Sequence, residues 1–520
     1  MPSFGMIKEM NGPNSRGVIW AEVVILLGIA IGLRVFNFYG FYGSDDSNYL
    51  RLARTLADGG DLSALMTKDA RVFGCRVGTY VPVAGFLRCV PSVEIAMVTY
   101  PFVMSLVGVL AVWWAGRTWL GGRTGLGAGL LLAGLPMETI NASQLLPDLP
   151  GSVWAFLGIM LIEWARRSDR IVRPMLGSML GGALLGLGWL CKETIVYIVL
   201  VVCLYWIGSA VRNPKRWRTT ISAGAGFGLI LLVEMIAYWR ISGDALFRFH
   251  VTEANFALGR SEFALGVGGS FFLSGQWGDL LDRLLVSAPK LFFLCPYYGG
   301  ILLIGSLAAV CAIVKRWKQY SFVVFWFTGL LLLFDFGPIR LYPYQPAVLF
   351  DRYLYPLFYP AVLVSAGVIR YLWIEPVMTL RIRWGNRLVA GILTGVLLGG
   401  YAWGFYFTHN KAEYPATVRS LARQMDPQVR VYSDPTTLEM IRCYWNYPSA
   451  TALTDFNRYS TESIDSGSFV LINRVILGSY RNLPRYAIPD FCDRSPEGWI
   501  VRYQSSRCVL YFVPKANARE

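Results

Sequence analysis

Long apolar stretches recur along this chain of 520 residues, and they leave it few ways to fold. A helix of roughly 20 apolar residues spans the hydrocarbon core of a bilayer, because the helix satisfies its own backbone N–H and C=O groups. Only 16% of the residues are charged, whereas 55% are hydrophobic. We therefore predict a polytopic α-helical membrane protein. About eleven spans are expected, at residues 18–36, 94–115, 124–137, 150–165, 175–191, 194–211, 219–239, 290–313, 320–337, 353–374 and 388–408.

Basic residues gather in every second loop between these spans. The loops near residues 117–123, 166–173, 212–218, 315–318 and 381–387 hold clusters of Arg and Lys. Short basic loops stay on the cytoplasmic side of a membrane. Lys8 and Arg16 place the amino terminus there too, so an odd number of spans puts everything after Thr408 outside.

The chain divides into two predicted domains. Residues 1–408 form the membrane domain, and residues 409–520 form a small extracytoplasmic α/β domain of more polar composition. Patterning within this second domain predicts strands at 429–433, 468–473, 499–503 and 508–513, with helices at 415–425 and 436–445.

Composition argues against several functional classes. The net charge of +15 suggests nucleic acid, but so many basic residues lie in the inner loops that orientation and anionic lipid headgroups explain most of it. No nucleic-acid partner is expected. No CxxC motif or cluster of histidines indicates a zinc site, and the nine cysteines suggest no particular disulfide pairing.

An acidic pair opens the first outer loop, in the segment FYGSDDSNYLRLARTL. Asp45 and Asp46 precede an amphipathic helical pattern at 47–57, typical of a helix lying along the membrane interface. Aspartate is also a favoured helix cap, so capping and catalysis both remain open for this pair.

Two further charged motifs lie at the outer ends of spans. Asp148 stands between prolines in LLPDLPGSVW, where it either caps a helix or faces a polar cavity. Lys192 and Glu193 interrupt apolar sequence in GLGWLCKET, and their alternative reading is a snorkelling pair in a tight turn.

Cations occur in the same outer loops, at Arg71 and Arg76 before the second span and at Arg248 and His250 after the seventh. Acids and converging cations suit a reaction in which a hydroxyl loses its proton while a phosphate departs. A sugar linked to a polyprenyl phosphate supplies such a leaving group.

Taken together, the acidic first loop, the proline-flanked Asp148, GLGWLCKE and DRYLYPLFYP (351–360) resemble motifs of a known superfamily. They are similar to those of the GT-C glycosyltransferases that include protein O-mannosyltransferases and aminoarabinose transferases. The resemblance covers roughly residues 18–408. It implies a GT-C fold, a polyprenyl-phosphate sugar donor held among apolar spans, a glycan, lipid or protein acceptor, and a place in the bacterial inner membrane.

The resemblance also implies inverting transfer and a role for each matching residue. Asp45, with Asp46 as the alternative, would be the general base, and Asp148 would position or activate the acceptor. No catalytic metal is implied, although two aspartates would suit a divalent ion. The donor phosphate would meet Arg76, Lys192, Arg248 and Arg352, and the substrate would be lined by Tyr49, Glu193, His250 and Tyr353.

Some features depart from the aminoarabinose enzymes: an Asp-Asp pair replaces Asp-Glu, and Arg replaces Lys in the first loop. The identities of the sugar and the acceptor therefore stay open. The competing function is a lipid or glycolipid transporter or flippase, which predicts inverted repeats and charges in the middle of spans. Here the singled-out charges lie at the outer ends of spans, and no repeat is visible. A ligand sensor would account for the tail alone.

Overall fold

The computed structural model describes most of the chain: residues 13–43, 45–61, 71–167, 172–254, 285–286, 288–340, 345–346, 351–374, 380–446, 452–457, 459–480 and 487–514. Lys8, used above to predict the orientation, lies outside these residues, as does part of the 166–173 loop.

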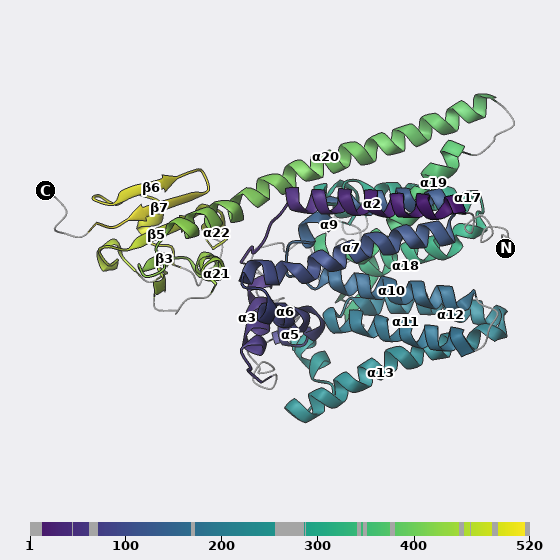
Figure 1. The fold of residues 1–520 in the computed structure, drawn as a ribbon, viewed down its shortest axis with the longest axis horizontal. Helices are drawn as coiled ribbons and strands as arrows, with labels where there is room; N and C mark the ends of the chain where they lie inside the picture. The colour runs from purple at the N-terminus through teal and green to yellow at the C-terminus, as the bar shows by residue number, and fades with distance from the viewer. Residues whose placement is uncertain are drawn as a thin grey trace.

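A helical bundle forms the membrane domain, as predicted, and each predicted span contains a helix (Figure 1). The span predicted at 290–313 is wrong as a single helix, because Pro296, Gly299 and Gly300 divide it into α16 (Ala288–Leu294), η6 (Pro296–Tyr298) and α17 (Ile301–Val314). Among the described residues, eight helices are long and apolar enough to cross a membrane. The other three predicted spans correspond to α8 and α17, of 12 and 14 residues, and to α10, which carries Asp148, Glu163 and Arg166. The spanning helices and these three are α2 (Pro13–Phe36), α7 (Val93–Trp119), α8 (Gly122–Ala133), α10 (Asp148–Arg166), α11 (Val172–Cys191), α12 (Ile195–Arg212), α13 (Trp217–Ser242), α17 (Ile301–Val314), α18 (Ser321–Phe336), α19 (Phe358–Ile374) and α20 (Leu380–Gln424).

Small residues let α10, α11 and α13 pack backbone against backbone. A Cβ atom added to Gly158 would overlap the carbonyl oxygen of Gly181, and one added to Gly182 would overlap that of Ala223. Such close approach is typical of helix packing in membranes, where van der Waals contact replaces the hydrophobic effect between helices. Because α10 begins where α11 ends, this packing places Asp148 beside Lys192.

Shorter elements cover one end of the bundle. In Figure 1, α3, α5 and α6 lie across this end, and the C-terminal sheet lies beyond the same end. The first loop therefore lies between the membrane helices and the C-terminal domain. The short elements of the membrane domain are α3 (Asp45–Ala57), α5 (Arg71–Gly74), α6 (Val77–Cys89), α9 (Pro136–Asn141), α16 (Ala288–Leu294), β1 (Pro338–Arg340), β2 (Gln345–Pro346) and the 3-10 turns η3 (Pro214–Arg216), η6 (Pro296–Tyr298), η7 (Lys318–Tyr320) and η8 (Asp351–Leu357).

The C-terminal domain is a five-stranded sheet in the order β4-β3-β5-β7-β6. Strands β4, β3 and β5 are parallel, whereas β7 pairs antiparallel with both β5 and β6. The four predicted strands are present, and the prediction missed β4, a short edge strand whose half-buried and exposed residues form no apolar run. The elements are β3 (Val431–Ser433), α21 (Pro435–Tyr444), β4 (Leu453–Asp455), η10 (Thr461–Ser463), β5 (Phe469–Asn473), α22 (Arg474–Tyr480), η11 (Asp490–Cys492), β6 (Ile500–Gln504) and β7 (Cys508–Phe512).

One helix, α20, connects the two parts of the molecule without a break. It has 45 residues and continues through residue 408, where the sequence predicts the domain boundary. The proposed division into 1–408 and 409–520 therefore falls inside a helix. Because a continuous helix is stiff, the C-terminal domain is held close to the end of the bundle that carries α3, α5 and α6.

Candidate active site

The two aspartates of the first loop have different surroundings. Asp46 is buried, and its carboxylate accepts hydrogen bonds from the backbone N–H groups of Tyr42, at 2.7 Å, and Ser47, at 3.0 Å. Asp45 is partly exposed, and its carboxylate pairs with the guanidinium of Arg352 at 2.5 Å. Asp46 is thus engaged by backbone N–H groups of its own loop, whereas Asp45 faces a cation that lies more than 300 residues away in the sequence.

Asp148 and Lys192 form a buried ion pair between the start of α10 and the end of α11. Their side chains are 1% and 3% exposed, so neither snorkels to solvent. Asp148 does not cap its helix: Pro147 is the N-cap residue of α10, and no side chain makes a capping hydrogen bond there. Its Oδ2 has no hydrogen bond to any described residue. Oδ2 of Asp148 can therefore accept a hydrogen bond while Oδ1 pairs with Lys192.

Tyr353 links these two ion pairs. Its ring centroid lies 4.0 Å from Nζ of Lys192 and 5.8 Å from the guanidinium carbon of Arg352. Cations at these distances are attracted to the negative face of the ring. Asp45, Arg352, Tyr353, Lys192 and Asp148 therefore form one continuous polar cluster, with both cations on the same tyrosine.

A second group of charges adjoins this cluster. Arg76 pairs with Glu193 at 3.0 Å and donates a 2.6 Å hydrogen bond to the hydroxyl of Tyr49. Behind them, the buried Arg248 pairs with Glu234 at 2.7 Å and donates to the Trp189 carbonyl. Burial raises the pKa of Glu193, but Arg76 and Arg248 outweigh burial and bring it below its ordinary value. Glu193 is therefore ionised and holds Arg76 in place.

The structure does not bring every candidate residue into this cluster. His250 is exposed and pairs with Asp244 at 2.7 Å, away from the groups around Tyr353. Arg248 lies one layer behind, against Glu234. The other nine candidate residues meet at the same end of the bundle; their roles remain predictions.

No candidate metal centre is found within the described residues, because no three His, Cys, Asp or Glu side chains converge there.

Sequence reasoning missed two residues that support the first loop, Glu94 of α7 and Arg419 of α20. Their side chains pair at 2.5 Å. Arg419 also donates to the carbonyl of Tyr39 at 3.1 Å, and Glu94 accepts from the N–H of Phe41 at 3.3 Å. Between these bonds lies Gly40, with φ +71°, where a Cβ atom would overlap both side chains. The glycine was the only sequence signal for this contact.

Two tyrosines of the C-terminal part also bind the backbone of the first loop. The hydroxyl of Tyr444, at the end of α21, donates to the carbonyl of Phe41 at 2.9 Å, and that of Tyr414 donates to Tyr42 at 3.1 Å. Gly43 has φ +78°, and a Cβ atom there would lie 2.8 Å from the Thr436 methyl group. Both glycines before the aspartates thus allow α20 and α21 to approach, so the C-terminal domain holds the loop that carries Asp45.

Substituting Arg419 with alanine is expected to lower the rate of turnover about 10- to 100-fold while leaving the protein in the membrane. The loss has two causes: the backbone of Tyr39 loses a donor, and Glu94 keeps a charge without a partner. In a double-mutant cycle with Glu94→Gln, the two effects should be far from additive, with a coupling of about 1–3 kcal/mol. Arg423→Ala, on an exposed face of the same helix, is the matched control. Additive effects would show that the pair does not act as a unit.

Comparisons with known proteins agree with this geometry. Residues 83–239 match the sequence profile of the family described as dolichyl-phosphate-mannose-protein mannosyltransferase. No curated protein sequence matches the chain significantly.

Solved structures match over nearly the whole chain. ArnT from Cupriavidus metallidurans in its apo state has a TM-score of 0.55 at 14% identity, covering 96% of this chain and 98% of ArnT. The same protein bound to undecaprenyl phosphate has a TM-score of 0.54 at 15% identity, covering 94% and 97%. The Archaeoglobus fulgidus oligosaccharyltransferase, in complex with Zn and sulfate, has a TM-score of 0.54 at 12% identity, covering 95% of this chain and 74% of that one. The resemblance predicted from the motifs is therefore confirmed at the level of the fold: this chain has the architecture of the GT-C glycosyltransferases.

Proposed function

We propose that this protein is a membrane glycosyltransferase that moves a sugar from a polyprenyl phosphate to an acceptor hydroxyl. The observation that carries the proposal is the polar cluster at the end of the bundle. There, the partly exposed Asp45 pairs with Arg352. Arg352 and Lys192 both lie against the ring of Tyr353. Such an arrangement places a proton acceptor next to groups that can neutralise a departing phosphate.

In the proposed reaction, Asp45 accepts the proton of the acceptor hydroxyl as its oxygen attacks the anomeric carbon. The bond between that carbon and the phosphate oxygen breaks, and the polyprenyl phosphate leaves with the electron pair. Attack from the face opposite the phosphate inverts the anomeric configuration. Arg352, Lys192 and Arg76 stabilise the developing negative charge, while Asp148 holds Lys192 and offers its free oxygen to the acceptor.

The comparisons support the choice of donor. The matched ArnT structure contains undecaprenyl phosphate, and the matched profile is that of enzymes described by their dolichyl-phosphate-mannose donor. Both are lipid phosphates whose isoprenoid chains suit an apolar bundle. We place the protein in the bacterial inner membrane with the cluster and the C-terminal domain outside. Two basic residues support this orientation. Arg166 ends α10, the helix that begins at Asp148, and Arg216 follows α12, the helix that begins just after Lys192.

The test is transfer by the purified protein in lipid nanodiscs, with a panel of labelled sugars linked to undecaprenyl phosphate and with glycan, lipid and peptide acceptors. We expect at least one pair to give a new glycoside together with an equal amount of free undecaprenyl phosphate. NMR of the product reports the anomeric configuration. A retained configuration would contradict direct attack, and movement of intact donor across a bilayer without cleavage would favour a transporter.

We also propose that transfer needs no divalent metal. The expected result is an unchanged rate after dialysis against EDTA, because Arg352, Lys192 and Arg76 supply the positive charge that a metal would otherwise provide at the phosphate. The measurement compares the initial rate before chelation, after chelation, and after adding back Mg²⁺ or Mn²⁺. A rate that falls with EDTA and returns with one of these ions would overturn metal independence.

Transfer is expected to fall as the pH rises through about 8. Burial lowers the pKa of Lys192 and Asp148 opposes that shift, while the nearby Arg352 and Arg76 add to it; together they bring the pKa to about 8. Lys192 is therefore charged below pH 8 and loses its proton above it, so kcat/KM for the donor should decline there. Lys192→Arg keeps its charge at every accessible pH and should remove this decline. An identical alkaline limb in the arginine variant would assign the titration to another group.

A further inference from the structure

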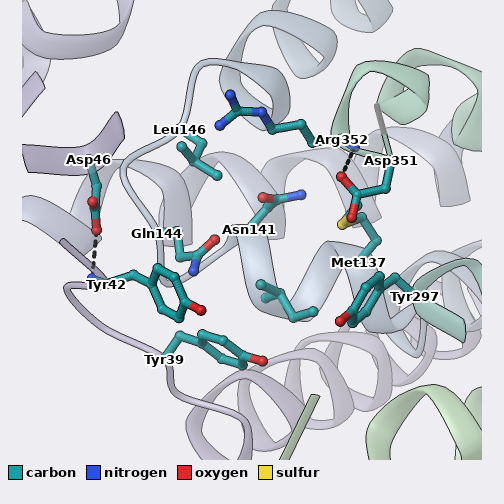
Figure 2. Close-up of a pocket in the computed structure, with 11 residues that line it drawn as sticks. Tyr39, Tyr42, Asp46, Met137, Asn141, Gln144, Leu146, Tyr297, Asp351 and Arg352 are labelled. Carbon is teal, nitrogen blue, oxygen red and sulfur yellow. Dashed lines mark hydrogen bonds between the residues drawn. The ribbon is translucent and has the colours of Figure 1, made fainter. Parts of the chain in front are cut away.

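A cavity of about 300 Å³ adjoins the first loop and Arg352 (Figure 2). Nothing in the motifs pointed to it, because its walls come from four separate parts of the chain. The lining residues are Tyr39, Tyr42, Asp46, Met137, Ile140, Asn141, Gln144, Leu146, Tyr297, Asp351 and Arg352.

Tyrosines and amides dominate the polar wall of the cavity. Figure 2 shows the side chains of Asn141 and Gln144 between the rings of Tyr39 and Tyr42 on one side and Tyr297 on the other. Asn141 is only 2% exposed, yet its Nδ2 has no hydrogen-bond partner among the described residues. A buried donor without a partner destabilises the fold unless a ligand or water meets it. This amide is therefore placed to bind a ligand rather than to hold the fold together.

The charges around the cavity favour a ligand without negative charge. Two carboxylates line it, Asp46 and Asp351, each anchored by a backbone N–H at 2.7 Å. The one cation in the lining, Arg352, already pairs with Asp45. Lys192 and Arg76 do not line the cavity, so a phosphate is better placed beyond Arg352, around Tyr353.

We propose that this cavity binds a single sugar ring that carries no negative charge, either neutral or amino-substituted; the proposal rests on the transfer function above. Tyrosine faces pack against the C–H groups of a sugar, while amides and carboxylates bond its hydroxyls. The volume is at the lower end of the range for small-ligand sites, roughly 300–1,000 Å³, which suits one ring. A uronic acid would bring a third carboxylate beside Asp46 and Asp351.

The ring belongs either to the donor or to the acceptor, because Arg352 lines the cavity and pairs with Asp45, the proposed base. A donor would extend its phosphate past Arg352 toward Lys192, and an acceptor would present a hydroxyl to Asp45. The chemistry that recognises the ring is the same in both cases, so the experiment separates the two sources.

The first arm compares wild type with Asn141→Ala and Gln144→Ala in nanodiscs, using undecaprenyl phosphate with and without a linked hexose. Gln424→Ala, on an exposed part of α20, is the matched control. If the ring is the donor's, each variant should lose about tenfold in affinity for the linked hexose and none for undecaprenyl phosphate itself. If it is the acceptor's, donor affinity should hold while the acceptor KM rises about tenfold. Unchanged values for both substrates would overturn the assignment.

The second arm tests charge. Wild type should use a hexuronic acid at least tenfold less well than the matching hexose or hexosamine, in the donor or the acceptor role found above, and Asp351→Asn should narrow that difference. Equal use of hexose and hexuronic acid by wild type would overturn the proposed selectivity. Failure of the proposed function has a different signature: no donor would give transfer. In that case the sugar-dependent gain in affinity over undecaprenyl phosphate still decides whether the cavity binds a ring.

Discussion

Replacing Asp45 with asparagine is expected to lower the rate of sugar transfer about 10³-fold, with little change in donor affinity. The amide has nearly the same shape as the carboxylate but cannot take the acceptor's proton, and general base catalysis contributes roughly 10²- to 10⁴-fold. Arg352 loses a partner at 2.5 Å and keeps its contact with Tyr353, so the donor phosphate still meets a positive site. The loss should therefore appear in kcat.

Two control variants separate loss of the base from a general effect of removing an aspartate in this loop. Asp58→Asn, at the exposed end of the same loop helix, should transfer sugar as wild type does. Asp46→Asn should act differently, because Asp46 accepts two backbone N–H groups of the loop: it should lower thermal stability along with activity. If Asp45→Asn retains wild-type turnover, while Asp46→Asn abolishes it without loss of stability, the base is Asp46.

Replacing Lys192 with methionine is expected to produce the largest combined loss of activity and stability. The substitution leaves Asp148 buried and without its cation, and breaking a buried ion pair in this way costs about 3–5 kcal/mol. It also removes a cation from the proposed phosphate site, which should lower transfer by about 100-fold or more. We would measure the thermal midpoint in detergent and the transfer rate in nanodiscs.

The double variant Asp148→Asn, Lys192→Met separates these two effects. With both charges gone, the pair no longer carries an unpaired carboxylate, so much of the stability should return. Activity should stay low, because the phosphate still lacks its lysine. Lys215→Met, in an exposed inner loop, controls for the loss of a lysine as such. Recovery of transfer in the double variant would show that Lys192 serves only the fold.

The C-terminal domain supports the first loop by hydrogen bonds from Tyr444 and Arg419. Its sequence showed no catalytic motif, and its strands are regular enough to be predicted. Yet Tyr444 of α21 and Arg419 of α20 both bond the backbone of residues 39–41. Changes in the tail are therefore expected to alter catalysis through the loop that carries Asp45.

Local patterns were enough to predict the membrane helices and most of the sheet. A run of apolar residues or a strand alternation is a property of neighbours in sequence, so α2, α11 or β5 can be recognised without knowing what they touch. The same reasoning overlooked β4 and the unbroken α20, since a partly exposed edge strand has no apolar run and a polar tail does not reveal that a helix continues into it.

The sequence by itself determined the fold class, the ends of the helices as the place of the charged motifs, and the residue types available for chemistry. Only the tertiary structure decided which charges meet: Lys192 with Asp148 rather than with its neighbour Glu193, Asp45 with Arg352, and Glu94 with Arg419. The reason is physical. A buried charge is stable only beside a partner, and the packing of helices distant in sequence selects that partner. Glycines such as Gly40 and Gly182 allow this close packing, but their presence in the sequence does not show which segments will meet.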